Sequence, residues 1–494
     1  MRWLRKQIDL QLFWSIFAFI PALTLRESVQ FCDIGPNHPV AILSDLSMAS
    51  NSPVILRFPE RSSPEEDPIV ITGVGIASSL GSSREAVWQN IQLGTSGIRR
   101  TEASDGVGEL RLPCGMVDWL PPNSNSLKSI QLTQHAAAEA LGDATIDWRT
   151  VDRERFACSV SAQFGDIGYL FMPESERDSK PLDEYKHRWW EEFLPSTPSH
   201  RIGNQFQLYG PRLCHTTACA SGLISTIVAA RMIRDDQADF ALCGAGDAVT
   251  QLVYAAFARM GVLADNDDPA SACKPFDVNR KGFVIGEGAA MMVLEKRSTA
   301  IARGARIYAE LAAAQMLNQA HHVTGLDGDA GPMEALVERL VSKAGWGYLG
   351  PQYINAHGTG TEQNDRCELQ AIRTALKDRA DKVLVSSNKA VLGHLINAAG
   401  SIELALTAMA LRDGYVPPTM HLETPETVGQ IDCMPKLGAK VEIERALKLS
   451  LAFGGHLVGV ALRRCPIADH QRTAVALHPQ ALLRDNKKAL RRAA

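Results

Sequence analysis

The sequence Thr216-Thr217-Ala218-Cys219-Ala220-Ser221-Gly222-Leu223 places one cysteine among small residues, directly before an apolar run at helical spacing that continues to Met232. A thiol at the start of a helix faces unpaired backbone N–H groups and the positive end of the helix dipole, and both favour the thiolate. Small neighbours leave room for an extended substrate. The pattern therefore predicts that Cys219 is a nucleophile at a helix N-terminus.

Two histidines lie in equally unusual surroundings further along the chain. His357 stands in Asn355-Ala356-His357-Gly358-Thr359-Gly360-Thr361, and His394 stands in Gly393-His394-Leu395. Each of the three residues alone is more typical of a core, because a lone cysteine packs as a small hydrophobe and a histidine can bond a buried carbonyl. Together, one cysteine and two distant histidines indicate covalent acyl transfer.

Further motifs stand in order around these three residues. They are Lys274-Pro275-Phe276-Asp277, Gly282-Phe283-Val284-Ile285-Gly286-Glu287-Gly288-Ala289, Ser386-Ser387-Asn388-Lys389 and Ala452-Phe453-Gly454-Gly455. In this order and at similar spacing, the set resembles the β-ketoacyl-acyl carrier protein synthases, closest to the elongating type II enzymes of bacterial fatty acid synthesis. The resemblance extends from about Asp67 to about Arg464.

Between its ends the chain alternates short apolar runs with helical patterns, which indicates an α/β protein with sheets covered by helices. The sequence predicts strands at Pro68–Val74, Phe156–Val160, Phe240–Cys243, Ala289–Leu294, Tyr353–Asn355 and Val383–Ser386. It predicts helices at Arg84–Leu93, Ser129–Leu141, Gly222–Ile233, Met333–Ala344, Glu368–Leu376 and Ile402–Leu411. Near the end, two apolar runs flank Gly454 and Gly455 and predict a hairpin.

The resemblance implies the thiolase fold, in which two similar five-stranded halves form α-β-α-β-α layers. We expect an N-terminal extension (1–66), a first half with the nucleophilic cysteine (67–303), a second half with both histidines (304–464) and a basic tail (465–494). The periodicity of the sequence does not itself reveal this duplication.

The resemblance also implies roles for the site residues. Cys219 would take an acyl chain from a carrier-protein thioester. His357 and His394 would stabilise the enolate that forms when malonyl-carrier loses carbon dioxide, since each neutral imidazole can offer one N–H. The backbone N–H groups of Cys219 and Phe453 would hold the oxyanion of the tetrahedral step. The glycines beside Phe453 could equally form an ordinary tight hairpin.

Lys389 occupies the position of a family lysine. It lies in a run of small and apolar residues, which favours a buried and paired ammonium over the usual surface charge. Asp365 and Glu368 match acidic positions of the family and share one helix face. We expect them to pair with Lys389 and to orient His357; the alternative is a solvated, acidic helix start.

The last motif departs from the family pattern. The family usually carries Gly-Phe-Gly-Gly-Thr-Asn, whereas this chain reads Ala452-Phe453-Gly454-Gly455-His456-Leu457. Alanine removes backbone freedom from a loop that must move to admit the second substrate, and His-Leu replaces two hydrogen-bonding side chains. Gln163 and Phe164 also replace small family residues. A specialised synthase of a secondary pathway is therefore an alternative to a primary fatty acid enzyme.

Composition fits a large enzyme and narrows its partners. With 494 residues and a net charge of −4, neither nucleic acid nor an acidic membrane surface is the obvious partner. The ten cysteines include no Cys-x-x-Cys pair, which fits a reducing cytoplasm. We expect no metal and no bound cofactor, because no phosphate loop or clustered ligand set is present. The resemblance implies acyl carrier protein as the partner, bearing acyl- and malonyl-phosphopantetheine thioesters, with a homodimer as the default and a heterodimer as the alternative.

The segment before Asp67 admits two interpretations. Basic residues precede an apolar run from Leu10 to Leu25, as in a signal peptide or a short membrane anchor. The run is short and interrupted for a membrane-spanning helix. We favour translation from Met48 and a cytoplasmic enzyme, because the expected substrates are bound to cytoplasmic carriers.

Two other functions compete with condensation. One is a non-condensing partner subunit, like the chain-length factors that pair with active synthases; those typically lack the cysteine, so Cys219 argues against it. The other is an acyltransferase that moves acyl groups without decarboxylation. The two histidines argue against it, because simple transfer needs no enolate site.

Overall fold

The computed structural model describes residues 67–101, 103–104, 109–121, 126–162, 194–325, 328–428 and 431–465. The expectations for residues 1–66, for Gln163 and Phe164, and for the tail after Cys465 lie outside the described residues.

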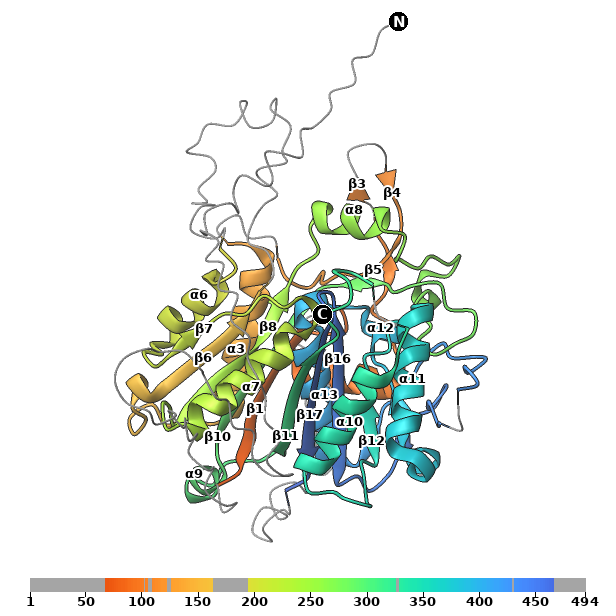
Figure 1. The fold of residues 1–494 in the computed structure, drawn as a ribbon. Coiled ribbons are helices and arrows are strands. Elements are labelled where there is room, and N and C mark those ends of the chain that lie inside the picture. Colours follow the sequence, from red (N-terminus) through yellow and green to blue (C-terminus); the bar gives the residue numbers. More distant parts are fainter. Residues whose placement is uncertain are drawn as a thin grey trace, which may run out of the picture. The chain divides into compact units, whose positions relative to one another are not determined.

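One mixed sheet of ten strands forms the centre of the fold (Figure 1). One side of it is built, from the middle outward, from β1 (Ile69–Ser78), β10 (Gly288–Lys296), β8 (Phe240–Asp247), β6 (Phe156–Ser161) and β7 (Arg212–Leu213). The other side is built from β11 (Ala309–Asn318), β17 (His456–Arg463), β16 (Arg445–Ala452), β12 (Tyr353–Asn355) and β13 (Leu384–Ser386).

The two sets of five strands repeat one pairing pattern. The inner strands β1, β10 and β8 are antiparallel, as are β11, β17 and β16. The outer strands β8, β6 and β7 are parallel, as are β16, β12 and β13. The sets join where Val70 and Ile71 of β1 pair with Glu310 and Ala309 of β11. The repeated pairing is the duplication that the family resemblance implied, while the boundary near Arg303 stays a prediction.

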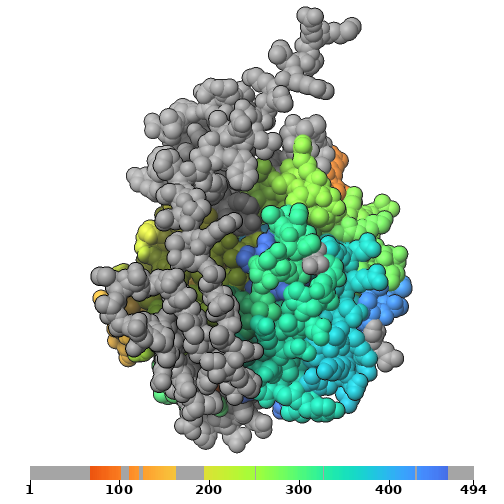
Figure 2. Space-filling view, viewed as in Figure 1, coloured from red at the N-terminus to blue at the C-terminus, as the bar shows by residue number. Residues whose placement is uncertain are grey.

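Helices cover both faces of each set of strands. Strand β10 shows this in its side chains: Ala289, Met291 and Val293 pack in the cluster with the outer helix α3, and the alternate residues face the central helices. The outer layer of the first set consists of α3 (Lys128–Asp143) and α6 (Thr197–Phe206). The central layer consists of α7 (Ser221–Arg234) and α13 (Ala399–Asp413). The outer layer of the second set consists of α10 (Gly331–Lys343) and α11 (Glu362–Leu376). The predicted α-β-α-β-α architecture is therefore confirmed. In Figure 2, α10 and α11 form part of the molecular surface in green-blue and cyan.

The two central helices cross closely where the site lies. A Cβ atom on Gly222 of α7 would come within 2.7 Å of the backbone nitrogen of Ser401 on α13. A Cβ atom on Gly400 would lie 3.0 Å from Cγ of Leu223. Every residue of α13 from Ala399 to Leu411 is buried, as expected for a helix enclosed on all sides. Small residues at this crossing let α7 and α13 bring their N-termini together.

The predicted elements are present. Helices α2 (Arg84–Leu93), α3, α7, α10, α11 and α13 and the six predicted strands all occur, and some of their bounds differ from the predicted ones by a few residues. Shorter elements complete the fold: β2 (Arg99–Arg100), β3 (Ala103–Ser104), β4 (Glu109–Leu110), β5 (Pro113–Gly115), α8 (Gln251–Arg259), β9 (Ile285–Gly286), α9 (Arg297–Ala302), α12 (Lys389–Leu392), β14 (Tyr415–Val416) and β15 (Ala439–Lys440). Within the described residues, no helix is both long and apolar enough to span a membrane.

The predicted hairpin is formed by β16 and β17, with Phe453, Gly454 and Gly455 as its loop. Gly454 and Gly455 adopt φ angles of 84° and 78°, which are accessible to glycine and strained for other residues. Ala452 is the last residue of β16 and pairs with His456 across the turn. The alanine that departs from the family pattern therefore takes an ordinary strand conformation.

Candidate active site

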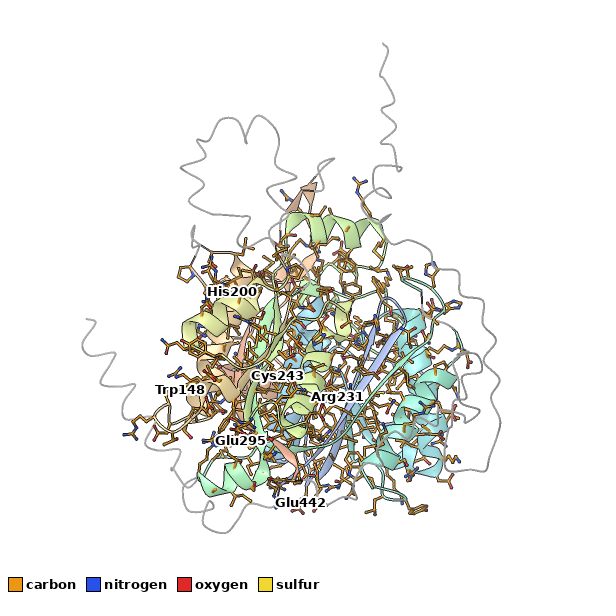
Figure 3. The ribbon with its side chains drawn as sticks, turned by 60° about the vertical axis from the view of Figure 1, so that its left-hand side comes forward. Trp148, His200, Arg231, Cys243, Glu295 and Glu442 are labelled. Carbon is orange, nitrogen blue, oxygen red and sulfur yellow. The ribbon has the colours of Figure 1, made fainter. Side chains whose placement is uncertain are left out.

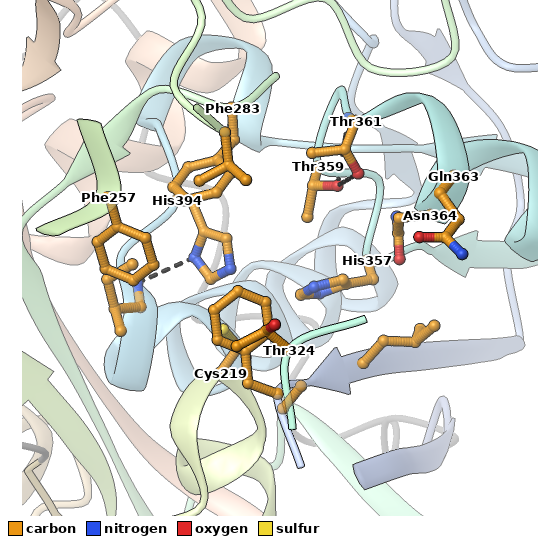
Figure 4. A pocket seen from close by; sticks show the side chains of 15 residues that line it. Cys219, Phe257, Phe283, Thr324, His357, Thr359, Thr361, Gln363, Asn364 and His394 are labelled. Carbon is orange, nitrogen blue, oxygen red and sulfur yellow. Dashed lines mark hydrogen bonds between the residues drawn. The ribbon is translucent and has the colours of Figure 1, made fainter. Parts of the chain in front are cut away.

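Cys219 lies in the short 3₁₀ turn η3 (Ala218–Ala220) that leads directly into α7. Its side chain is 8% exposed and lines a pocket (Figure 4). Burial raises the pKa of the Cys219 thiol to about 12, against smaller opposing effects of Lys389 and the backbone. Burial therefore opposes the thiolate that the helix N-terminus was expected to favour, because desolvation disfavours the charged sulfur.

His394 lies between α12 and the turn η6 (Ile396–Ala398) that opens α13. Its backbone N–H donates to the carbonyl of Val284 at 2.6 Å. Its Nδ1 accepts the backbone N–H of Ile396 at 2.9 Å. Burial, with help from nearby lysines, holds the pKa of His394 well below its usual range, so the ring is neutral. With Nδ1 occupied as an acceptor, the proton sits on Nε2, and the ring is a hydrogen-bond donor.

His357 follows β12 and faces His394 across the pocket. Its ring centroid lies 5.4 Å from that of His394, and the two planes meet at 86°. Burial, and then the charge of Lys389, lowers the pKa of His357 well below its usual range. Its Nδ1 is buried and has no hydrogen-bond partner among the described residues. Figure 4 shows both imidazoles and Cys219 turned toward one space, so the three predicted residues are brought together.

The carboxylates of Glu368 and Asp365 hold the backbone beside His357. Glu368 accepts the backbone N–H of His357 at 2.6 Å and that of Gly358 at 2.8 Å. Asp365 accepts the N–H of Thr359 at 3.0 Å and, from another segment, that of Phe276 at 2.7 Å. Both carboxylates are fully buried. They position the His357 loop through backbone amides and are not a solvated helix start.

The ion-pair partner of Lys389 is Glu403, and the expectation that it pairs with Asp365 or Glu368 is wrong. Its ammonium lies 2.5 Å from Oε1 of Glu403 and donates to the carbonyl of His357 at 2.6 Å. Glu403 projects from the first turns of α13, close to the segment that carries Lys389. The two acidic groups on α11 are already saturated by backbone N–H donors, which leaves Glu403 as the counter-ion.

Glu403 and Lys448 are site residues that the sequence reading missed. Lys448 on β16 is fully buried, and its ammonium lies 2.7 Å from Oε2 of Glu403. A lysine within the otherwise apolar run Leu447–Ala452 and a glutamate within the apolar run of α13 were the available signals, because a charge in a buried run needs a partner. Periodicity alone could not say that the two charges meet.

Aromatic side chains line the pocket from the hairpin loop to His394. Phe453 lies 6.3 Å from Phe257 between ring centroids, Phe257 lies 5.5 Å from Phe283, and Phe283 lies 5.2 Å from the His394 ring. On the His357 side the wall is polar, and the hydroxyls of Thr359 and Thr361 are 2.9 Å apart. The pocket therefore has an apolar wall beside His394 and a hydrogen-bonding wall beside His357.

The hairpin loop is attached to the segment after β11. The N–H of Gly454 donates to the carbonyl of Val323 at 2.7 Å, and Nδ2 of Asn318 donates to the carbonyl of Gly454 at 2.9 Å. His456, which replaces a family threonine, keeps its Nδ1 3.5 Å from Nδ2 of Asn318. Leu457 is fully buried in the core behind the loop. The replacement at His456 thus retains a polar contact, and the replacement at Leu457 adds to core packing.

Two other cysteines, Cys158 and Cys243, belong to the core. Cys243, labelled on β8 in Figure 3, is fully buried, and so is Cys158 on β6. Burial raises the pKa of each to about 12. Among the described residues no group of three or more histidine, cysteine or acidic side chains is arranged to hold a metal ion.

Family models match both sides of the fold. The model described as "Beta-ketoacyl synthase, N-terminal domain" matches residues 125–300, and "Beta-ketoacyl synthase, C-terminal domain" matches residues 308–423. The tetracenomycin polyketide synthase ketoacyl synthase alpha subunit of Streptomyces glaucescens is 34% identical over 420 residues, which are 81% of this chain and 97% of that protein. The chain belongs to the β-ketoacyl synthase family. The predicted family and its ketosynthase activity class are confirmed.

Other β-ketoacyl synthases resemble the chain to a similar degree. The 3-oxoacyl-[acyl-carrier-protein] synthase 2 of Vibrio cholerae is 35% identical over 408 residues, covering 78% of this chain and 96% of that protein. Among solved structures, the chain matches the AntDE:AntF complex, a type II polyketide acyl-carrier protein with its ketosynthase bound to the hexaketide. The TM-score is 0.74 at 28% identity, and the match covers 81% of this chain and 100% of that chain. Relatives from fatty acid and polyketide synthesis are thus equally similar.

Proposed function

We propose that this β-ketoacyl synthase condenses a carrier-bound acyl group with malonyl-carrier through an acyl-Cys219 intermediate. The observation that carries the proposal is the meeting of one thiol and two neutral imidazoles at the wall of a single pocket. Relatives named for both fatty acid and polyketide synthesis support the same reaction in either pathway.

The first half-reaction transfers the acyl group to Cys219. The sulfur attacks the thioester carbonyl, its C–S bond to the carrier breaks, and the carrier leaves as a thiol. Because the pKa of Cys219 is about 12, its proton leaves during the attack and passes to the departing sulfur. In this proposal the backbone N–H groups of Cys219 and Phe453 stabilise the oxyanion.

The second half-reaction forms the carbon–carbon bond. The malonyl carboxylate leaves as carbon dioxide, and its electron pair passes into an enolate whose oxygen accepts hydrogen bonds from His357 and His394. The enolate carbon then attacks the acyl carbonyl, the C–S bond breaks, and the released Cys219 thiolate takes a proton from solvent water. Neutral imidazoles suit this role, because they donate a hydrogen bond to the developing negative charge without transferring their proton. The enolate is therefore stabilised and is not protonated before it attacks the acyl carbonyl.

The proposal favours condensation over the two competing functions. A non-condensing subunit would have no use for a cysteine that lines the pocket. An acyltransferase without decarboxylation would have no use for two histidines held neutral by burial and by two lysines. Burying lysines that suppress imidazolium formation costs free energy of folding. A site that binds an enolate explains this cost, because it requires neutral imidazoles.

The proposed partner is an acyl carrier protein, and the proposed assembly is a homodimer in the cytoplasm. Similar solved structures include ketosynthases bound to an acyl-carrier protein and to a chain-length factor, so a heterodimer is the alternative assembly. No disulfide joins the described cysteines to one another, which supports a reducing compartment.

The experiment that tests the function has two stages. The protein is incubated with acyl-carriers of graded chain length, and intact-mass spectrometry records the adduct on Cys219. Malonyl-carrier is then added, and the 3-oxoacyl-carrier product is measured. An adduct that disappears into product supports condensation; a stable adduct that is only exchanged between carriers would establish an acyltransferase instead.

A further inference from the structure

Lys448 places a fully buried ammonium group behind the two histidines. Its Nζ lies 2.7 Å from Oε2 of Glu403 and donates to the carbonyl of Ala356, the residue before His357, at 3.1 Å. It also donates to the carbonyl of Leu449. The three N–H groups of the ammonium therefore have acceptors, as a buried cation requires.

Glu403 carries one negative charge and does not by itself balance the charges of both Lys389 and Lys448. Lys389 already pairs with the other oxygen of that carboxylate at 2.5 Å. Burying a second ammonium costs free energy unless it balances a further charge. Glu368 supplies such a charge when it is ionised: burial raises its pKa to about 7, and the ammonium of Lys448 opposes this shift. Two ammonium groups and two carboxylates thus surround the backbone of His357.

We propose that Lys448 is a positioning residue for the condensation step, which rests on the function proposed above. Its ammonium anchors Glu403 and the carbonyl of Ala356, so that the backbone entering His357 is held from β16 as well as from Lys389. Its positive charge also keeps both imidazoles neutral and favours the negative charge that develops on the enolate. Lys448 is not among the groups that act most strongly on the Cys219 thiol, so we expect acylation to depend on it less than condensation does.

The charge of Lys448 changes within an accessible pH range. Burial lowers the pKa of Lys448 to about 8, although Glu403 opposes the shift. The groups that face Lys448 are Glu403 from α13, Lys389 from α12, Glu368 from α11 and the imidazoles of His357 and His394. As the pH rises through about 8, the ammonium loses its proton and its support of the enolate.

Acylation and condensation should therefore respond differently to pH. The pKa of the Cys219 thiol is shifted most by burial, and the charges that act on it most strongly are those of Lys389, Glu403 and Asp247. Lys448 contributes to the lowered pKa of each histidine, after burial and Lys389. Removing its charge should raise the pKa of both imidazoles and leave the thiol unchanged.

The test compares Lys448→Met and Lys448→Gln in single-turnover experiments. Acylation of Cys219 and condensation with malonyl-carrier are measured separately across a pH range from acidic to alkaline. We expect condensation at neutral pH to fall about tenfold in both variants, on the scale of one charge acting through a protein interior. The acid limb of the condensation profile should move to higher pH and the alkaline limb should vanish, while acylation keeps the wild-type rate and profile.

Two comparisons keep the outcome decisive. Lys448→Gln retains a hydrogen-bond donor without the charge, so a return to the wild-type profile in that variant would overturn the electrostatic part of the proposal. Ser450→Ala, on the same face of β16, removes a buried hydroxyl that has no partner among the described residues and should leave both rates unchanged. An equal loss in Ser450→Ala would mean that β16 is merely sensitive to substitution.

The wild-type enzyme provides a measurement that needs no variant. Its condensation rate should fall above about pH 8 while acylation continues to rise, and a condensation rate that does not fall there contradicts the proposal even if both variants fail to fold. A wild-type protein that acylates Cys219 and never condenses would instead refute the proposed function.

Discussion

The imidazole rings of His357 and His394 stand 5.4 Å apart and almost perpendicular, at 86°. The two residues come from different elements, one after β12 and one before α13, and each backbone is bonded to a separate partner. Two donors held independently can point at one oxygen without having to move when charge develops there. This arrangement underlies the predictions that follow.

Cys219→Ala should abolish acyl-enzyme formation, because no other cysteine lines the pocket among the described residues. Decarboxylation of malonyl-carrier should persist, since both histidines remain. Intact-mass spectrometry after incubation with acyl-carrier, together with carbon dioxide release, checks both outcomes. An acyl adduct on the Cys219→Ala protein would contradict the assignment of the nucleophile.

His357→Ala and His394→Ala should each reduce condensation by a factor of about 10² or more, the scale of losing one oxyanion donor. Acylation of Cys219 should be largely retained, because it does not require an enolate site. Single-turnover acylation and condensation rates are the measurements. If acylation fell as steeply as condensation in both variants, the histidines would be serving the thiol instead.

Glu403→Gln should destabilise the fold by about 3–5 kcal/mol, because it leaves two buried ammonium groups without their carboxylate. Glu85→Gln is the matched control: that glutamate is 52% exposed and pairs with Arg412, so its loss should cost less than about 1 kcal/mol. Urea unfolding of the three proteins gives the comparison. Equal stabilities would show that the buried pair contributes no more than a surface pair.

Gly222→Ala should destabilise the crossing of α7 and α13 by about 1–3 kcal/mol, since its Cβ would meet the backbone of Ser401 at 2.7 Å. The displaced helix carries Cys219 at its start, so acylation should slow as well. Gly142→Ala in α3 is the control, because its Cβ would meet nothing within 4 Å and alanine favours helix. Thermal unfolding separates the two, and a neutral Gly222→Ala would show that the helices can move apart.

Alkylation of Cys219 by a small neutral reagent should accelerate up to strongly alkaline pH. Burial raises the pKa of the thiol to about 12, and below that value the reactive thiolate increases about tenfold per pH unit. The site of alkylation is followed by peptide mass spectrometry. A plateau reached near neutral pH would mean that the helix dipole overcomes burial after all.

The sequence reading located most of the long elements but did not name the helices α6 and α8 or the strand β11. Residues Ala309–Asn318 of β11 are rich in alanine and also carry leucine, methionine and one glutamate, all of which favour helices. They form a strand because they lie between β1 and β17, where pairing with both neighbours satisfies their backbone. The helix propensity of this segment is thus overridden by its pairing with two distant strands, which no local sequence pattern indicates.

The sequence reading of the site succeeded where a residue stands in a distinctive motif. Cys219, His357, His394 and Phe453 all line one pocket. It failed where a residue acts through a distant partner, since Lys389 meets Glu403 and the neighbouring ammonium of Lys448 had no motif to mark it. Charges on separate elements can be matched only when their distances are known.

By itself, then, the sequence determined the alternation of strands and helices and the identity of the thiol and the two imidazoles, because periodicity and motifs are local properties of a chain. Tertiary structure alone decided that burial raises the pKa of the Cys219 thiol, that Glu403 pairs with two lysines, and that Glu368 holds the backbone of His357. The physical reason is that burial and charge pairing depend on which distant segments exclude water together.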